Sequence, residues 1–200
     1  KKISLAIFGF LIILVISVVA ILSTTGITTV KLNKPISNKI NEKNPNLSVK
    51  IKKIKFKFDL KSLNLYLETS IPEVNYKNLD IPINQVKAYL DIVSLIKSKP
   101  KINKVLLSTD EVNIETLKKI ILKIKPTSFN SIIINKIKKG KLYLNLELYF
   151  NDELTLNNYI AKGEVKEMSG KINEKFMIND AYFNFFADKS DTLIKNINFD

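Results

Sequence analysis

The chain has 200 residues and a formal net charge of +13, and all 32 of its basic residues are lysines. It contains no cysteine, histidine, tryptophan or arginine, which excludes disulfides, thiolate metal sites and catalysis by a histidine base. Base readout and bidentate phosphate binding favour arginine, so we expect no nucleic-acid partner and instead attribute any charge effect to anionic lipid head groups.

An uncharged apolar segment, Ile3–Leu22, lies close to the N-terminus, and fifteen of its twenty residues are Leu, Ile, Val or Phe. As a helix rising ~1.5 Å per residue, it would cover ~30 Å, the thickness of the hydrocarbon core of a bilayer. A cleaved signal peptide would have a shorter apolar region and a small-residue cleavage site, which Ala20-Ile21-Leu22 does not supply well. We therefore predict a transmembrane anchor over residues 1–25. Its lipid-facing positions include Ile3, Phe10, Leu14 and Leu22.

The orientation of this anchor follows from the lysines that flank it and from the domain that follows it in the sequence. Lys1 and Lys2 favour a cytoplasmic N-terminus, although Lys31, Lys34 and Lys39 lie near the other end. Long domains are translocated largely regardless of charge. We therefore expect a single-pass membrane protein with a cytoplasmic N-terminus and residues 26–200 exported as one domain.

Short helices and strands follow the anchor. Gly26 suits a left-handed helix cap, Pro35 begins a short helix, and Asn44-Pro45-Asn46 ends it. Apolar and polar residues alternate from Leu47, and Lys53 shifts the phase of this alternation, which predicts a β-bulge. A second strand places three leucines on one face: Leu63, Leu65 and Leu67.

Two more helices interrupt the predicted strands. Asp91 can cap a helix over Ile92–Ser98, which Pro100 ends. Asn113 can cap an amphipathic helix over Ile114–Lys125, which Pro126 ends.

The last third of the chain is predicted to be antiparallel β-structure. Ile132–Ile137 and Lys141–Phe150 flank a hairpin turn at Lys138-Lys139-Gly140. The second of these strands has one aliphatic face, formed by Leu142, Leu144, Leu146, Leu148 and Phe150. Strands are then predicted at Leu154–Lys166, Lys171–Ile178, Ala181–Asp188 and Leu193–Phe199, separated by turns at Ser169-Gly170, Asn179-Asp180 and Ser190-Asp191. The fold class is thus mainly β with a few short helices (α+β).

No constellation of residues predicts catalysis. There is no glycine-rich phosphate loop and no nucleophile paired with a base. Acidic residues gather at Asp110, Glu111 and Glu115 and again at Asp188 and Asp191. We interpret the first group as neighbours of a helix dipole and the second as turn residues rather than metal ligands. We expect no enzyme activity, no metal and no cofactor.

Taken together, the order of these elements resembles the AsmA-like superfamily of TamB and YhdP type, anchored in the inner membrane of Gram-negative bacteria. The resemblance rests on the anchor, the strand LSVKIKKIKFKF, the segment VKAYLDIVSLIKSKPKINKVLLSTDEVNI, and YIAKGEVKEMSGKI with FMINDAYFNFFADKSDTLIKNI after it. In the family's helical motif a glycine is usual where this chain has Ser98. We also expect the sheet to continue beyond Asp200 in a longer protein.

The resemblance implies a bacterial inner-membrane protein whose residues 26–200 lie in the periplasm. It also implies a curved antiparallel sheet that begins an elongated β-groove, in which phospholipid moves between the inner and outer membranes. The implied groove-facing residues are Leu63, Leu65, Leu67, Leu142, Leu144, Leu146, Leu148 and Phe150. An outer-membrane protein is an implied further partner. Three alternatives remain open. The leucines could pack into an ordinary core, or the same fold could be an envelope scaffold that engages its partners through strand edges. The chain could also belong to a membrane-tethered hydrolase whose catalytic residues lie beyond Asp200.

Overall fold

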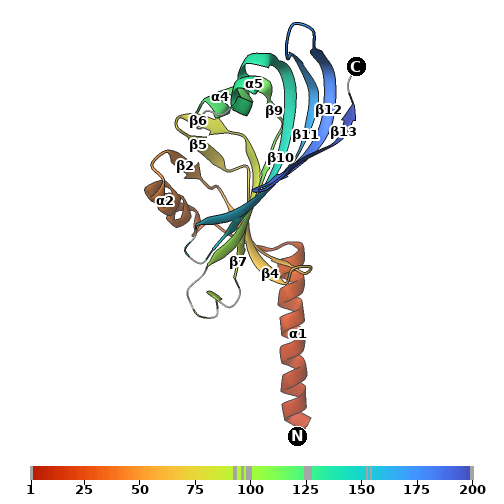
Figure 1. Ribbon diagram of the computed structural model, residues 1–200. Helices are drawn as coiled ribbons and strands as arrows, with labels where there is room; N and C mark the ends of the chain where they lie inside the picture. Colours follow the sequence, from red (N-terminus) through yellow and green to blue (C-terminus); the bar gives the residue numbers. More distant parts are fainter. Residues whose placement is uncertain are drawn as a thin grey trace.

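The computed structural model describes residues 2–91, 94–95, 97, 101–123, 128–151, 153 and 155–198 (Figure 1). The described chain is mainly β, as predicted. Its helices are α1 (Lys2–Thr24), α2 (Asn33–Lys43), α4 (Ile114–Lys123) and α5 (Ser128–Lys136).

Helix α1 projects away from the rest of the molecule (Figure 1). Its segment Ala6–Thr24 is long and apolar enough to cross a membrane, and none of it is buried in the protein. A membrane anchor and a signal sequence share these properties. The helix ends as predicted, because Gly26 adopts φ 71° and its N–H donates to the carbonyl oxygen of Ile21 at 2.9 Å.

Ten antiparallel strands form one large sheet. In chain order they are β1 (Ile27–Thr29), β3 (Ile54–Asp59), β4 (Asn64–Ser70), β7 (Ile83–Leu90), β8 (Ile102–Thr109), β9 (Val112–Asn113), β10 (Ile137–Phe150), β11 (Leu156–Lys171), β12 (Met177–Asp188) and β13 (Thr192–Asn198). Apart from β9, which pairs with β10, their spatial order β1-β3-β4-β7-β8-β10-β11-β12-β13 follows the sequence. The sheet is twisted but not strongly curled, so the predicted groove shape is not confirmed (Figure 1).

A smaller sheet contains β2 (Leu47–Lys50), β5 (Glu73–Tyr76) and β6 (Leu79–Ile81). It lies with α2 on the side of the molecule away from β11–β13 (Figure 1). This arrangement corrects the predicted β-bulge at Lys53. β2 belongs to the small sheet and β3 to the large one, so the phase shift marks the passage of the chain from one sheet to the other. Ile54, at the start of β3, is only 2% exposed.

Both helix caps predicted from sequence are present. The Asn113 Oδ1 atom accepts the N–H of Thr116 at 2.9 Å, at the start of α4. The Asp91 Oδ1 atom accepts the N–H of Ser94 at 2.6 Å. Most of the helix predicted over Ile92–Ser98, and the end of the other at Pro126, lie outside the described residues.

The predicted hairpin around Lys138-Lys139-Gly140 is wrong. Residues 128–136 form α5, and β10 runs from Ile137 through the expected turn to Phe150. Gly140 adopts φ 153°, and the pairing of β10 with β11 shifts on either side of Lys139, so the glycine accommodates a bulge inside a long strand. A short run of isoleucines suits a helix or a strand, which is why its pattern did not decide between them.

Two of the predicted C-terminal turns also lie inside strands. Ser169-Gly170 belongs to β11, and Asn179-Asp180 belongs to β12. The pairing of β11 with β12 shifts its register between Val165 and Gly170, and Asp180 adopts φ 48°. The third turn is confirmed, because the N–H groups of Ser190 and Asp191 donate to the Asp188 carboxylate at 2.8 and 2.9 Å. Both hydrogen bonds lower the pKa of the Asp188 carboxyl group, and the bond from the Asp191 N–H has the larger effect.

Candidate functional site: the two faces of the large sheet

The strand register sorts side chains of the large sheet onto two faces, because directly paired residues point to the same side. One row of pairs crosses the sheet through Phe56, Leu67, Ala88, Val105 and Leu148. A second row joins Val86, Leu107, Leu146, Ala161 and Ala187. A third joins Leu144, Gly163, Phe185 and Ile194. We call the side that carries these three rows the apolar face.

Six of the predicted site residues lie together on the apolar face. Leu142, Leu144, Leu146 and Leu148 alternate along β10, and the register places Leu65 and Leu67 of β4 on the same side. All six are half-buried rather than buried. Their aliphatic surface is therefore still partly open to solvent.

The other two predicted site residues differ. Leu63 precedes β4, has φ 51° and is 64% exposed, so it belongs to the turn between β3 and β4 and not to the apolar face. Phe150 is the last residue of β10, where its pairing with Leu156 follows a register shift. It is half-buried.

Gly163 and Phe185 form a packing feature of the apolar face that the sequence analysis missed. A Cβ atom on Gly163 would overlap the Phe185 ring and would lie 2.6 Å from the carbonyl oxygen of Tyr143. The ring therefore lies directly over the glycine, between β11 and β12. An isolated glycine inside a strand pattern is the signal that could have predicted such a close approach.

Few apolar side chains are fully buried. The buried apolar side chains among the described residues are Ile54, Tyr89, Leu90, Val112, Ile121, Ile137 and Ala181. Within the described ranges, Ile121 of α4 is the one helical residue in this set. Among the described residues, most of the apolar face therefore lacks the second layer that would complete an ordinary two-layer core.

The opposite face, here called the polar face, carries alternating lysine, glutamate and tyrosine. The rings of Tyr66 and Tyr89 stack with centroids 5.1 Å apart, and the Lys104 ammonium lies 4.6 Å from the centroid of Tyr89. Glu147 accepts hydrogen bonds from the hydroxyl of Tyr149 at 2.7 Å and from Lys162 at 3.1 Å. These contacts cross from β4 to β11 and join polar side chains on this side of the sheet, where Tyr89 is itself only 7% exposed.

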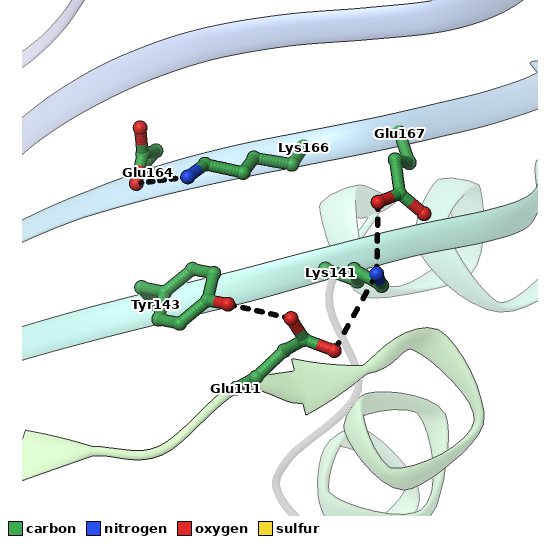
Figure 2. Close-up of polar contacts among 6 residues, drawn as sticks. All are labelled: Glu111, Lys141, Tyr143, Glu164, Lys166 and Glu167. Carbon is green, nitrogen blue, oxygen red and sulfur yellow. Dashed lines mark hydrogen bonds and ion pairs between the residues drawn. The ribbon is translucent and has the colours of Figure 1, made fainter.

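A second polar cluster lies where β9, β10 and β11 meet (Figure 2). The Tyr143 hydroxyl donates to Glu111 at 2.5 Å, and Lys141 bridges Glu111 at 3.7 Å and Glu167 at 2.8 Å. The hydrogen bond to Glu111 raises the pKa of Tyr143, and the hydrogen bond to Glu167 raises the pKa of Lys141. Beside them Lys166 pairs with Glu164 at 3.1 Å.

This cluster has the properties of a solvated surface. Its side chains are well exposed, and exposed ion pairs contribute little to stability. Glu115 lies in the first turn of α4, as expected for a neighbour of the helix dipole, and pairs with Lys118 at 3.8 Å. Glu111 contacts Lys141 and Tyr143. In the part of the chain that the structure describes, no group of three or more acidic residues could hold a metal ion.

A shallow, open depression of about 740 Å³ lies over β10–β13 on the polar face. Its lining combines polar and apolar residues: Tyr143, Asn145, Lys162, Glu164, Asn184 and Lys195 with Gly163, Phe185, Phe186 and Leu193. This lining offers hydrogen bonds, charge and some apolar surface.

Two tyrosines of the polar face are expected to ionise unusually late. Burial, followed by the charge of Asp59, raises the pKa of Tyr89 to about 12, and the hydrogen bond to Glu147, followed by burial, raises that of Tyr149 to about 12. The folded state therefore favours their neutral forms, and the stability they contribute is lost as the pH rises from about 10 towards 12. Tyrosinate absorbance should show a late step that Tyr89→Phe and Tyr149→Phe each reduce. A single step near pH 10 for all seven tyrosines would contradict this.

Comparisons of the chain with known protein families, curated proteins and solved structures found no match. The resemblance to the AsmA-like superfamily therefore stays a hypothesis.

Proposed function

We propose that the chain is a membrane-anchored envelope protein that shields phospholipid acyl chains on the apolar face during transfer between the inner and outer membranes. The observation that carries this proposal is a set of half-buried apolar side chains, in overlapping rows that together cross the sheet from β3 to β12, opposite the polar face. Contiguous apolar surface of this kind is typical of lipid or protein contact sites.

The position of the anchor supports the proposal. β1 follows α1 directly and pairs with β3, and each later strand of the main path lies further from that edge. The apolar face thus begins beside the helix and extends outward from it. Lipid leaving the bilayer around α1 would meet β3 and β4 first and could then move across successive strands.

Retention of an acyl chain on the apolar face needs no catalytic group. Each acyl CH₂ removed from water contributes roughly 0.8 kcal/mol, so a few contacts with the leucines of β10 would retain a chain. Because the sheet is not strongly curled, the proposed lipid lies along an open face rather than inside a closed tube. Half-exposed leucines leave area available for this contact.

A photo-crosslinking experiment in membranes tests the proposal. A benzophenone amino acid placed at Leu144 or Leu146 should crosslink labelled phospholipid. The matched controls are Tyr143 and Glu147, the neighbours in β10 that point to the polar face. Lipid adducts at the leucines and not at the controls are expected. Absence of lipid adducts at both leucines would overturn the proposal.

A second candidate function is an envelope scaffold that engages protein partners by strand addition. Among the described residues, β13 pairs with β12 alone, and its Leu193, Ile194 and Ile197 are 47%, 48% and 58% exposed. An unpaired edge of this kind can accept a strand from another chain. A benzophenone at Ile197 that crosslinks protein, with no lipid adduct at Leu144 or Leu146, would favour the scaffold.

A further inference from the structure

The turn between β3 and β4 lies beside the end of the anchor. β1 leads away from α1, and β3 returns antiparallel to it, with Ile27 opposite Phe56. Three residues of β3 beyond Phe56 carry the chain back toward the helix by up to ~10 Å. Gly26 packs against this returning strand, where a Cβ atom would lie 2.7 Å from both Lys57 Cγ and the Phe56 carbonyl oxygen. In Figure 1 the end of the hairpin lies next to the upper end of α1.

This turn presents two leucines to solvent. Leu60 is 60% exposed and Leu63 is 64% exposed, with Lys61 exposed between them. Asp59 fixes the turn, because its Oδ1 atom accepts the N–H of Lys61 at 2.9 Å and that of Ser62 at 3.5 Å. Leu63 adopts φ 51°, a conformation that is uncommon for a bulky side chain.

The chemistry of the turn matches the bilayer interface. Exposed leucines gain free energy on entering the boundary between head groups and acyl chains, and a lysine between them can extend its ammonium group to anionic head groups. The location favours this occupant over a soluble partner, because a helix long enough to span a membrane ends beside the turn. Leucines exposed at the far end of the sheet would not lie beside α1, and their exposure alone would not favour a membrane contact.

We propose that Leu60–Leu63 is a second membrane contact, in which Leu60 and Leu63 enter the interface of the bilayer that α1 spans and Lys61 meets its anionic head groups. The inference rests on the proposed role of α1 as an anchor. Two contacts, the helix and the turn, would fix the sheet relative to the membrane. They would hold the β3 edge of the apolar face against the lipid.

The absence of cysteine makes a direct test possible. Leu60→Cys, Leu22→Cys and Lys175→Cys are each labelled with the fluorophore NBD in the full chain. Each is reconstituted in phosphatidylethanolamine and phosphatidylglycerol vesicles containing doxyl-labelled phosphatidylcholine. Lys175 lies in the turn between β11 and β12, at the opposite end of the sheet, and is exposed. We expect doxyl lipid to quench NBD emission at Leu60 and Leu22 and to leave Lys175 unchanged.

The outcomes separate this inference from the proposed anchor. Quenching at Leu22 without quenching at Leu60 overturns the second contact and leaves the anchor intact. Absence of quenching at both overturns the anchor, and the inference with it. Equal quenching at Leu60 and Lys175 shows non-specific adsorption and also overturns it. Adding Leu63→Asp to the labelled Leu60→Cys chain should reduce the quenching, because a carboxylate disfavours the interface.

Discussion

Replacing Gly163 with valine is expected to lower the free energy of unfolding by about 3 kcal/mol, the upper part of the usual range for overpacking. The reason is local, because the Phe185 ring and the Tyr143 carbonyl oxygen occupy the space that the first side-chain atom would need. The backbone of β11 can move little here, because the strand is paired with β10 on one side and with β12 on the other. Chemical denaturation of the detergent-solubilised chain, followed by far-ultraviolet circular dichroism, measures the change.

A double-mutant cycle shows whether the aromatic ring is the cause. Phe185→Ala removes the ring and should destabilise the protein by itself. If the overlap with the ring accounts for much of the effect of Gly163→Val, the two substitutions together should cost clearly less than their sum. Strict additivity would contradict the packing described for this pair. Lys162→Val, at the neighbouring exposed position, controls for the introduction of valine into β11.

The sequence predicted well those elements of the fold that depend on local signals. The apolar helix, the Gly26 cap and the caps at Asp91 and Asn113 each depend on a few adjacent residues. Their geometry does not depend on which strand lies next to which. These elements were therefore predicted without knowledge of the sheet.

The misplaced elements depend on contacts that are distant in sequence. Lys138-Lys139-Gly140 has turn composition, yet the pairing of Ile137 with Gly170 and of Lys139 with Ser169 holds this stretch in an extended strand. The same pairing keeps Ser169-Gly170 inside β11. Glycine suits a bulge as well as a turn, so composition alone could not separate the two.

For the candidate site too, some residues were predicted correctly and others were not. Period-two alternation placed the leucines of β10 on one face correctly, because a strand's two sides follow from its geometry. Leu63 was wrong because alternation was extended one residue into a turn that Asp59 organises. The depth of burial could not be predicted, since it depends on what covers the sheet. Sequence therefore indicated an apolar face but not the openness or the limited curl of the sheet.

Replacing Leu146 with aspartate is expected to reduce the phospholipid that co-purifies with the membrane-extracted chain by roughly 10- to 100-fold. The contribution of one well-buried leucine, ~1.5–3 kcal/mol, corresponds to about that change in affinity. Leu146 lies in the middle of β10, between Leu107 of β8 and Ala161 of β11, so acyl chains crossing the sheet would pass it. A carboxylate there would place a charge in their path. Lipid per mole of protein, measured by mass spectrometry, reports the effect.

The matched control is Asn145→Asp, which introduces the same charge one residue away on the polar face, where the side chain is exposed. It should leave lipid content unchanged. Leu146→Phe, which keeps the position apolar, should retain lipid and so separate charge from shape. Denaturation midpoints of the three variants distinguish lost lipid contact from lost folding. Equal lipid loss in Asn145→Asp and Leu146→Asp would place the lipid elsewhere than the apolar face and would count against the proposed transfer surface.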